Sequence, residues 1–281
     1  MAAGVLQGSS FVFTEHSDSR LATGLWTAPM AGVEAGLIHS EVALAELQPG
    51  GHVAGHYHPF EESFYILSGA VLVSIDGHAY RLETNDFGVV PMATAHAWHN
   101  VGDEPVRWFR MRSPQPRLLA GPEASYKPAD LPLPDSGRDL GSLSPADRLV
   151  GRFAESHLPA PGPLSMPGYR GGNVSNISLW MLIDDLLGAL HHTMFIVEFT
   201  PGATPGDHYH PFEEAYYFLA GSAIARLDGE EVSVAAGDLV VAGTNALHGF
   251  RMTADVPTRW IEVQAPAPPP SGAFIFPQDW K

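Results

Sequence analysis

Two groups of histidine and glutamate with identical spacing carry the strongest chemical signal in the sequence. Their members are His56, His58, Glu62 and His96 in the first group and His208, His210, Glu214 and His248 in the second. Residues two apart on a strand point to the same face, so each His-x-His pair presents both imidazoles to one side. Three neutral imidazoles with one carboxylate suit Fe(II), Mn(II), Ni, Cu or Zn and are too rich in nitrogen for Ca or Mg. The pattern predicts one divalent transition metal per group, with Fe(II) or Mn(II) first among the candidates.

The two groups belong to an internal repeat. The heptapeptide His-Tyr-His-Pro-Phe-Glu-Glu at 56–62 recurs letter for letter at 208–214, an offset of 152 residues. Further pairs at this offset are Gly50 and Gly202, Asp86 and Asp238, and Trp108 and Trp260. Because the register never changes, we expect two copies of one domain without insertion or deletion in the core.

Short strands must position these ligands. In the first copy the apolar stretches 42–47, 64–67 and 70–75 are separated by glycine-containing turns. The dipeptides Asp76-Gly77 and Asp228-Gly229 are strong signals for two-residue hairpin turns. Many short antiparallel strands at regular spacing are typical of a barrel or jelly roll, so the predicted fold class is all-β.

We expect an N-terminal barrel at 1–112, a linker at 113–175 that is dense in Pro and Gly, and a C-terminal barrel at 176–281. The linker should contain one short helix near 145–156, because Ser144 can cap a helix and Pro145 suits its first position. We expect this helix to pack across the two barrels.

On its metal-ligand motifs the chain resembles the cupin family. The first cupin motif, G-x5-H-x-H-x3-E-x6-G, is matched twice, at Gly50, His56, His58, Glu62 and Gly69 and at Gly202, His208, His210, Glu214 and Gly221. The second motif, G-x5-P-x-G-x2-H-x3-N, is matched in part, by Pro91, His96 and Asn100 in the first copy and by Gly237 and His248 in the second. The resemblance implies a bicupin, with two tandem antiparallel jelly-roll barrels in one chain.

Composition limits the partners. The chain of 281 residues has a formal net charge of −16, which disfavours nucleic acid and anionic membranes, because both are bound through clustered Lys and Arg. Cysteine is absent, so disulfides and thiolate ligands are excluded. No apolar run approaches the roughly 20 residues of a membrane-spanning helix. We expect a cytoplasmic protein that acts on a small molecule, and a homodimer is a candidate assembly.

The neighbours of the ligands differ between the two copies. Trp98 and Phe250 share a strand face with a ligand histidine and are expected to line the substrate cavities. Arg110 could clamp a substrate carboxylate through paired hydrogen bonds. Tyr216 is a candidate proton donor and Glu262 a candidate base, so we favour the second barrel slightly as the catalytic one.

Four protein ligands leave one or two positions open on a six-coordinate ion, as catalysis requires. Among bicupins, the metal-dependent dioxygenases are most similar in site type, so we expect a dioxygenase-type oxidoreductase. Three alternatives stay open. They are a decarboxylase like the oxalate decarboxylases, a hydrolase like the ureidoglycine aminohydrolases, and a small-molecule-binding bicupin with a structural metal.

Overall fold

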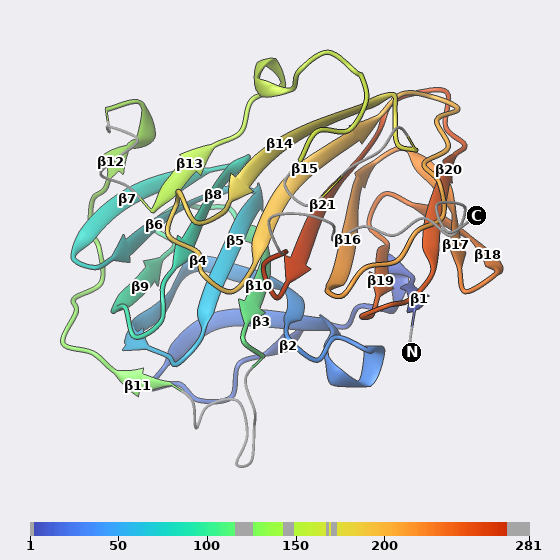
Figure 1. Cartoon of the computed structure of the whole chain (residues 1–281). Coiled ribbons are helices and arrows are strands. Elements are labelled where there is room, and N and C mark those ends of the chain that lie inside the picture. Colours follow the sequence, from blue (N-terminus) through green and yellow to red (C-terminus); the bar gives the residue numbers. More distant parts are fainter. Residues whose placement is uncertain (1–2, 116–125, 143–148, 167–168, 170–172, 269–281) are drawn as a thin grey trace.

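The computed structural model describes residues 3–115, 126–142, 149–166, 169 and 173–268. Strands make up most of this part of the chain and curl into two jelly-roll barrels that lie side by side (Figure 1). The predicted all-β fold with two tandem barrels is therefore confirmed. None of the helices in the described ranges is long and apolar enough to cross a bilayer.

The first barrel is one continuous sheet with the strand order β12-β7-β6-β9-β4-β10-β5-β8-β13, to which β3 and β11 add at β4 and β2 adds at β3. Its strands are β2 (Thr14–Glu15), β3 (Ala22–Ala31), β4 (Glu41–Tyr57), β5 (Glu61–Ser68), β6 (Ala70–Ile75), β7 (His78–Glu83), β8 (Asp86–Val90), β9 (His96–His99), β10 (Val106–Ser113), β11 (Lys127–Pro128), β12 (Arg138–Asp139) and β13 (Val150–Arg152).

Strand β4 connects the two faces of the first barrel. Its first half pairs with β10, and its second half pairs with β9. Gly50 lies at the change of partner with φ of +71°, a conformation that glycine adopts without strain. This bend places His56 directly opposite His96 on β9.

The second barrel repeats this design as a six-stranded sheet, β1-β19-β16-β21-β15-β14, and a three-stranded sheet, β18-β17-β20. Its strands are β1 (Ala3–Leu6), β14 (Ile177–Ile183), β15 (Thr193–Phe199), β16 (Glu213–Ala220), β17 (Ser222–Leu227), β18 (Glu230–Ala235), β19 (Leu239–Ala242), β20 (His248–Met252) and β21 (Thr258–Ala265). A single bridge between His208 and His248 takes the place of the longer β4–β9 pairing.

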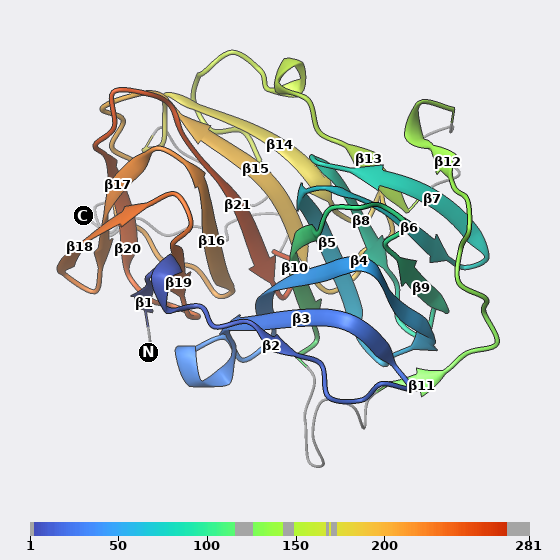
Figure 2. The same ribbon diagram turned by 180° about the vertical axis from the view of Figure 1, so that it is seen from behind.

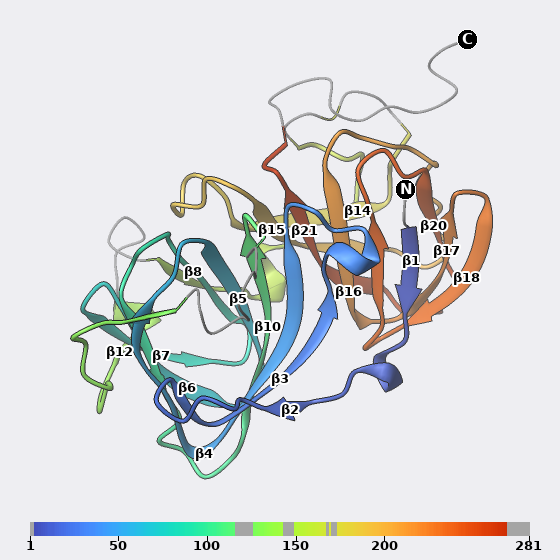
Figure 3. The ribbon, with the colours of Figure 1, turned by 90° about the horizontal axis from the view of Figure 1, so that it is seen from below.

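The barrels exchange edge strands. Strand β1, at the start of the chain, pairs with β19 of the second barrel and lies beside it in the view from behind (Figure 2). The view from below shows β1 among the strands of the second barrel (Figure 3). Strand β13, which precedes the second repeat, pairs with β8 of the first barrel (Figure 1). Each exchange covers a sheet edge that would otherwise expose unpaired backbone groups.

The segment near 145–156 differs from the expected helix. Residues 143–148 lie outside the described residues, Val150–Arg152 forms strand β13, and Glu155–His157 forms the single 3-10 turn η6. Val150 is buried against β8 in the first barrel, and pairing with an open sheet edge outweighs the local helix signals there. The other 3-10 turns in the described residues are η1 (Gly8–Ser10), η2 (Val33–Ala35) and η4 (Leu140–Ser142).

A shared apolar core joins the barrels. One cluster of buried residues takes Tyr65, Phe109 and Met111 from the first barrel and Met194 and Ile261 from the second. The ring of Phe109 also stacks on that of Tyr217, with centroids 5.5 Å apart. Two further cores fill the barrels themselves.

Candidate metal centres

Three histidines converge inside the first barrel. His56 lies at the end of β4, His58 directly follows that strand, and His96 begins β9. Their ligand atoms lie within 4.8 Å of one another, and all three residues are buried. Each Nδ1 is 2.7–3.0 Å from a backbone carbonyl oxygen. The carbonyl partners belong to Ala54, Phe60 and Thr94. A neutral imidazole that donates from Nδ1 presents a bare Nε2, which is the form that binds metal.

The electrostatics agree with this tautomer. Burial lowers the pKa of His56 to about 3 and the pKa values of His58 and His96 to about 4, so all three rings are neutral near pH 7. The Nε2 atom of His58 is buried and has no hydrogen-bond partner in the part of the chain that the structure describes. A buried polar atom without a partner is costly, and a divalent ion coordinated at Nε2 removes that cost. These residues therefore fit a transition metal.

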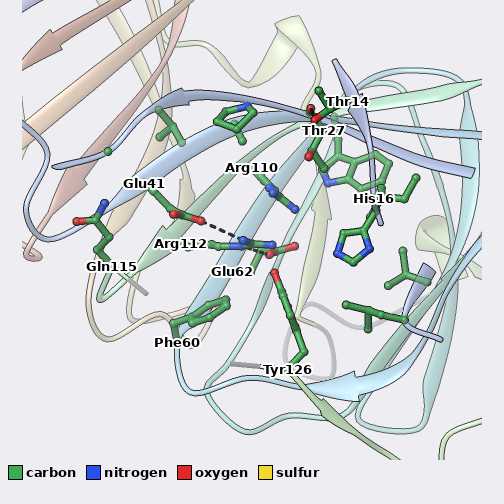
Figure 4. Close-up of a pocket in the computed structure, with 18 of the residues that line it drawn as sticks. Thr14, His16, Thr27, Glu41, Phe60, Glu62, Arg110, Arg112, Gln115 and Tyr126 are labelled. Atoms are coloured by element: carbon green, nitrogen blue, oxygen red, sulfur yellow. Dashed lines mark hydrogen bonds and ion pairs between the residues drawn. The ribbon is translucent and has the colours of Figure 1, made fainter. Parts of the chain in front are cut away.

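Glu62 does not join this cluster directly. Its Oε2 accepts a hydrogen bond of 2.6 Å from Nε of Arg112, and both side chains are buried. Burial by itself would raise the pKa of Glu62, but Arg112 and Arg110 hold it well below its usual range. Arg112 also donates to Glu41 at 3.0 Å (Figure 4). The carboxylate is thus an anion that is paired with a buried guanidinium beside the histidine cluster.

The second barrel brings all four of its predicted ligands together. The ligand atoms of His208, His210, Glu214 and His248 lie within 4.8 Å of one another, and each residue is buried. Each imidazole Nδ1 again faces a backbone carbonyl oxygen, at 2.8–3.0 Å. Oε2 of Glu214 lies 2.7 Å from Nε2 of His210 and 3.1 Å from Nε2 of His248. Bare nitrogens and a carboxylate oxygen repel one another at such distances unless a cation or proton lies between them, so this donor set also fits a metal.

Additional polar groups fill the space around the second cluster. The hydroxyl of Tyr216 contacts Oε2 of Glu214 and lies 2.9 Å from Nε2 of His248. Gln264 donates to Oε1 of Glu214 at 2.7 Å. Glu262 accepts from the Trp260 indole at 3.0 Å, and burial together with Glu214 raises its pKa well above the usual range. Burial and Glu214 also raise the pKa of Tyr216, which keeps its hydroxyl protonated.

The cavities beside the two clusters differ greatly in size. The cavity of the first barrel has a volume of about 830 Å³ and is lined by His56, His96, Glu62 and the indoles of Trp98 and Trp108. The cavity of the second barrel has a volume of about 50 Å³ and is lined by His208, Glu214, Tyr216, Phe250 and Glu262. The first can hold an organic molecule of several rings, whereas the second has room for only a few water molecules or one very small ligand.

Two residues of the first cavity's wall carry polar donors without partners among the described residues. They are Arg110, through its buried Nε atom, and Trp108, through its buried indole Nε1. Trp98, which also lines the cavity, stacks on Trp108 with centroids 4.8 Å apart and an interplanar angle of 4°. Phe60 and Tyr126 add further rings, and the guanidinium of Arg112 lies 5.2 Å and 5.5 Å from their centroids.

The expected site residues thus fall into two settings. Trp98 and Arg110 line the first cavity, while Phe250, Tyr216 and Glu262 line the second. Sequence reasoning did not identify Glu41 and Tyr126 as parts of the first site. Tyr126 lies outside the repeat, so no aligned partner drew attention to it, and the pairing of Glu41 with Arg112 depends on neighbouring strands.

Comparisons with known proteins agree with this architecture. A family model described as "Cupin domain" matches residues 43–111 and 195–264. Polyketide synthase CurC of Streptomyces cyaneus is 34% identical over 83 residues, which are 29% of this chain and 54% of that protein. Tetracenomycin polyketide synthase protein TcmJ of Streptomyces glaucescens is 29% identical over 127 residues, which are 45% of this chain and 80% of that protein. The match thus spans only about half the length of CurC.

Solved structures show the same fold over the whole chain. Oxalate decarboxylase of Lactobacillus farciminis, solved as a formate complex, superposes with a TM-score of 0.67 at 17% identity and covers 98% of this chain and 89% of its own. A tryptophan-to-tyrosine variant of the oxalate decarboxylase of Bacillus subtilis superposes with a TM-score of 0.66 at 16% identity and covers 100% of this chain and 81% of its own. At these identities the likeness establishes the fold.

Proposed function

Because this chain is a bicupin of the cupin superfamily, we propose that it is a metal-dependent enzyme whose reaction takes place in the first barrel. We further propose that its substrate is an organic acid with an aromatic or otherwise planar body and that the reaction is of the dioxygenase type. The observation that carries this proposal is the cavity of about 830 Å³ beside the first histidine cluster, whose wall contains Arg110 and the buried Trp108.

The chemistry of the wall supports an acidic substrate. The guanidinium of Arg110 can bind a carboxylate through two parallel hydrogen bonds, and the nearby indole N–H of Trp108 can donate a third. The parallel rings of Trp98 and Trp108 offer a flat face for a planar group. Two of the relatives carry polyketide synthase in their names, and a polyketide-derived aromatic acid has the size and chemistry that this cavity suits.

The metal would be held by Nε2 of His56, His58 and His96, with Glu62, which Arg112 holds, as the neighbouring carboxylate. A bound Fe(II) or Mn(II) supplies redox or Lewis-acid chemistry next to the substrate. The chain's own residues orient the acid, exclude water with the aromatic walls, and keep Glu62 ionised through Arg112. The second barrel, which sequence analysis favoured, supports catalysis less well, because Tyr216 and Glu262 surround a cluster with almost no space for a substrate.

A decarboxylase is the second candidate function. It is favoured by the same Arg110 side chain, which would place a carboxylate beside the histidine cluster, and by a short match to oxalate decarboxylase OxdC of Bacillus subtilis, 36% identical over 70 residues or 18% of that protein. A two-carbon diacid would leave most of the first cavity empty, which supports the larger substrate instead. The cytoplasmic location and the homodimer stay predictions.

The test loads the protein with Fe(II) or Mn(II) without oxygen and offers aromatic acids, catechols, flavonols, β-diketones, oxalate and ureidoglycine. Oxygen uptake that is lost in His56→Ala, and retained at saturating substrate in His208→Ala, is the expected result. Arg110→Gln should raise KM at least about tenfold, whereas Arg107→Gln, at an exposed arginine on the same strand that pairs with Glu46, should not. Carbon dioxide release without oxygen uptake would indicate the decarboxylase, and ammonia release the aminohydrolase. Activity lost only in His208→Ala would overturn the assignment to the first barrel.

A further inference from the structure

One wall of the first cavity is a loop that the other barrel holds in place. The loop joins β3 to β4 and contributes Val33, Glu34 and Ile38 to the lining, and Glu41 follows at the start of β4. Glu41 in turn pairs with Arg112 in the depth of the cavity (Figure 4). The loop therefore reaches from the outer cavity to the ion pair that contains Glu62.

Glu213 of the second barrel accepts hydrogen bonds from three consecutive residues of this loop. The backbone N–H of Ile38 donates to Oε2 at 2.7 Å, and that of His39 donates to Oε1 at 3.0 Å. The hydroxyl of Ser40 donates to Oε1 at 2.7 Å. Glu213 and Ser40 are each 1% exposed, so water does not compete for these contacts. Hydrogen bonds to a buried carboxylate are among the strongest in proteins.

The same loop is tied to a second part of the wall. The carbonyl oxygen of His39 accepts from the backbone N–H of Gln115 at 2.8 Å and from the hydroxyl of Ser113 at 3.1 Å. Gln115 also lines the first cavity. By fixing the peptide groups at 38–40, Glu213 thus fixes two neighbouring sections of the cavity wall.

The repeat supplies a matched counterpart. Glu61, at the position equivalent to Glu213, accepts from the backbone N–H groups of Leu190 and His191 in the second barrel, at 2.9 Å and 3.0 Å. These residues are the equivalents of Ile38 and His39. In the described part of the chain, however, the loop at 190–191 lines neither of the two cavities. The two glutamates make the same kind of contact between barrels, but only Glu213 supports a cavity wall.

We propose that Glu213 is a positioning residue for the first barrel: it sets the shape of the cavity and thereby the affinity for the substrate. This inference rests on the proposed function of the first cavity. Because Glu213 directly precedes Glu214 on β16, the second metal centre holds the strand end from which Glu213 reaches across. The second centre, whose own cavity is small, then serves substrate binding in the first barrel.

The experiment compares the metal-loaded full chain with its Glu213→Gln and Glu61→Gln variants, using salicylate as the probe and calorimetric titration as the measurement. Glutamine keeps the size of the side chain but leaves one acceptor oxygen and turns an NH2 group toward the loop donors. We expect Glu213→Gln to raise the Kd for salicylate about tenfold or more and Glu61→Gln to change it less than about twofold. Hydrogen exchange at the amides of Ile38 and His39 should become faster in Glu213→Gln alone.

An unchanged Kd in Glu213→Gln would overturn the inference. An equal loss of salicylate affinity in Glu213→Gln and Glu61→Gln would overturn it as well, because it would indicate a general weakening of the contact between the barrels. If Glu213→Gln does not fold, Ser40→Ala removes one donor and keeps the backbone contacts; it should weaken salicylate binding roughly two- to fivefold, and an unchanged Kd would again count against the inference. A wild-type protein that binds neither salicylate nor other aromatic acids would contradict the proposed function instead. In that case the exchange measurement still decides whether Glu213 orders the loop.

Discussion

Arg112 holds the motif glutamate of the first barrel through a hydrogen bond of 2.6 Å from its Nε atom to Oε2 of Glu62. At the equivalent position of the second barrel Gln264 donates to Oε1 of Glu214, which leaves Oε2 beside the histidines. The two copies thus differ at this position, and their clusters differ with it: with Arg112 the first barrel has three histidines beside an ion pair, and with Gln264 the second barrel has a compact cluster of four ligands. The same substitution places a second buried cation beside Arg110 in the first cavity.

Placing glutamine at position 112 and arginine at position 264 should change the metal affinities of the two centres in opposite directions. Arg112→Gln frees Glu62 to complete the first centre and should tighten metal binding there about tenfold, the size of effect that residues supporting a ligand have. Gln264→Arg should weaken the second centre by a similar factor. Titration of metal-free protein against a chelator of known affinity measures both. Equal affinities in the wild type and Arg112→Gln would show that the ion pair does not restrain Glu62.

Each barrel should bind one divalent transition metal, so protein purified without chelator should contain close to two per chain. His56→Ala should lose the first equivalent and keep the second, and the double variant of His208 and His210 to Ala should do the reverse. Elemental analysis measures both. Well-folded protein that contains no metal and takes up neither Fe(II) nor Mn(II) would refute the prediction.

The metal-free protein should lose stability as the pH falls from 7.5 to 5.0. The folded-state pKa values of His56, His58 and His96 lie at about 3 to 4, below the value of about 6.5 for an exposed histidine, so protons bind the unfolded chain more strongly in this range. Their contribution is complete above pH 6.5 and is lost as the pH falls toward 4. We expect the melting temperature to fall by roughly 5 °C.

Glu262 has the opposite effect on the pH dependence of stability, because its raised pKa in the folded state favours the folded protein at lower pH. Comparison of the wild type with His56→Gln therefore isolates the histidine contribution, and the variant should show the weaker pH dependence. Metal-loaded protein should depend on pH less than metal-free protein over the same range. If the melting temperature changes equally with pH in the wild type and in His56→Gln, the histidines of the first cluster are not neutral as proposed.

The two halves should not be stable apart. A chain of residues 1–140 lacks β13, which covers the edge of β8, and lacks the second-barrel side chains that pack on Tyr65, Phe109 and Met111. It also leaves β1 without its partner strand β19. We expect self-association or aggregation, measured by size-exclusion chromatography with light scattering. A stable monomeric half would contradict this expectation.

The sequence by itself determined the two barrels and the residue types of both metal clusters. The offset of 152 residues and the spacing of His56, His58 and His96 are properties of the chain order, and strand alternation converts them directly into a shared face. Three features depend on the tertiary structure instead. They are the exchange of β1 and β13, the hydrogen bonds from the loop at 38–40 to Glu213, and the pairing of Glu62 with Arg112. All three join segments distant in sequence, and such contacts depend on packing between elements, which leaves no periodic signal in the chain. For the same reason the capping signals of Ser144 and Pro145 did not predict that Val150 would join a strand. No pattern in the sequence predicted that the cavity of the first barrel is large and that of the second barrel small.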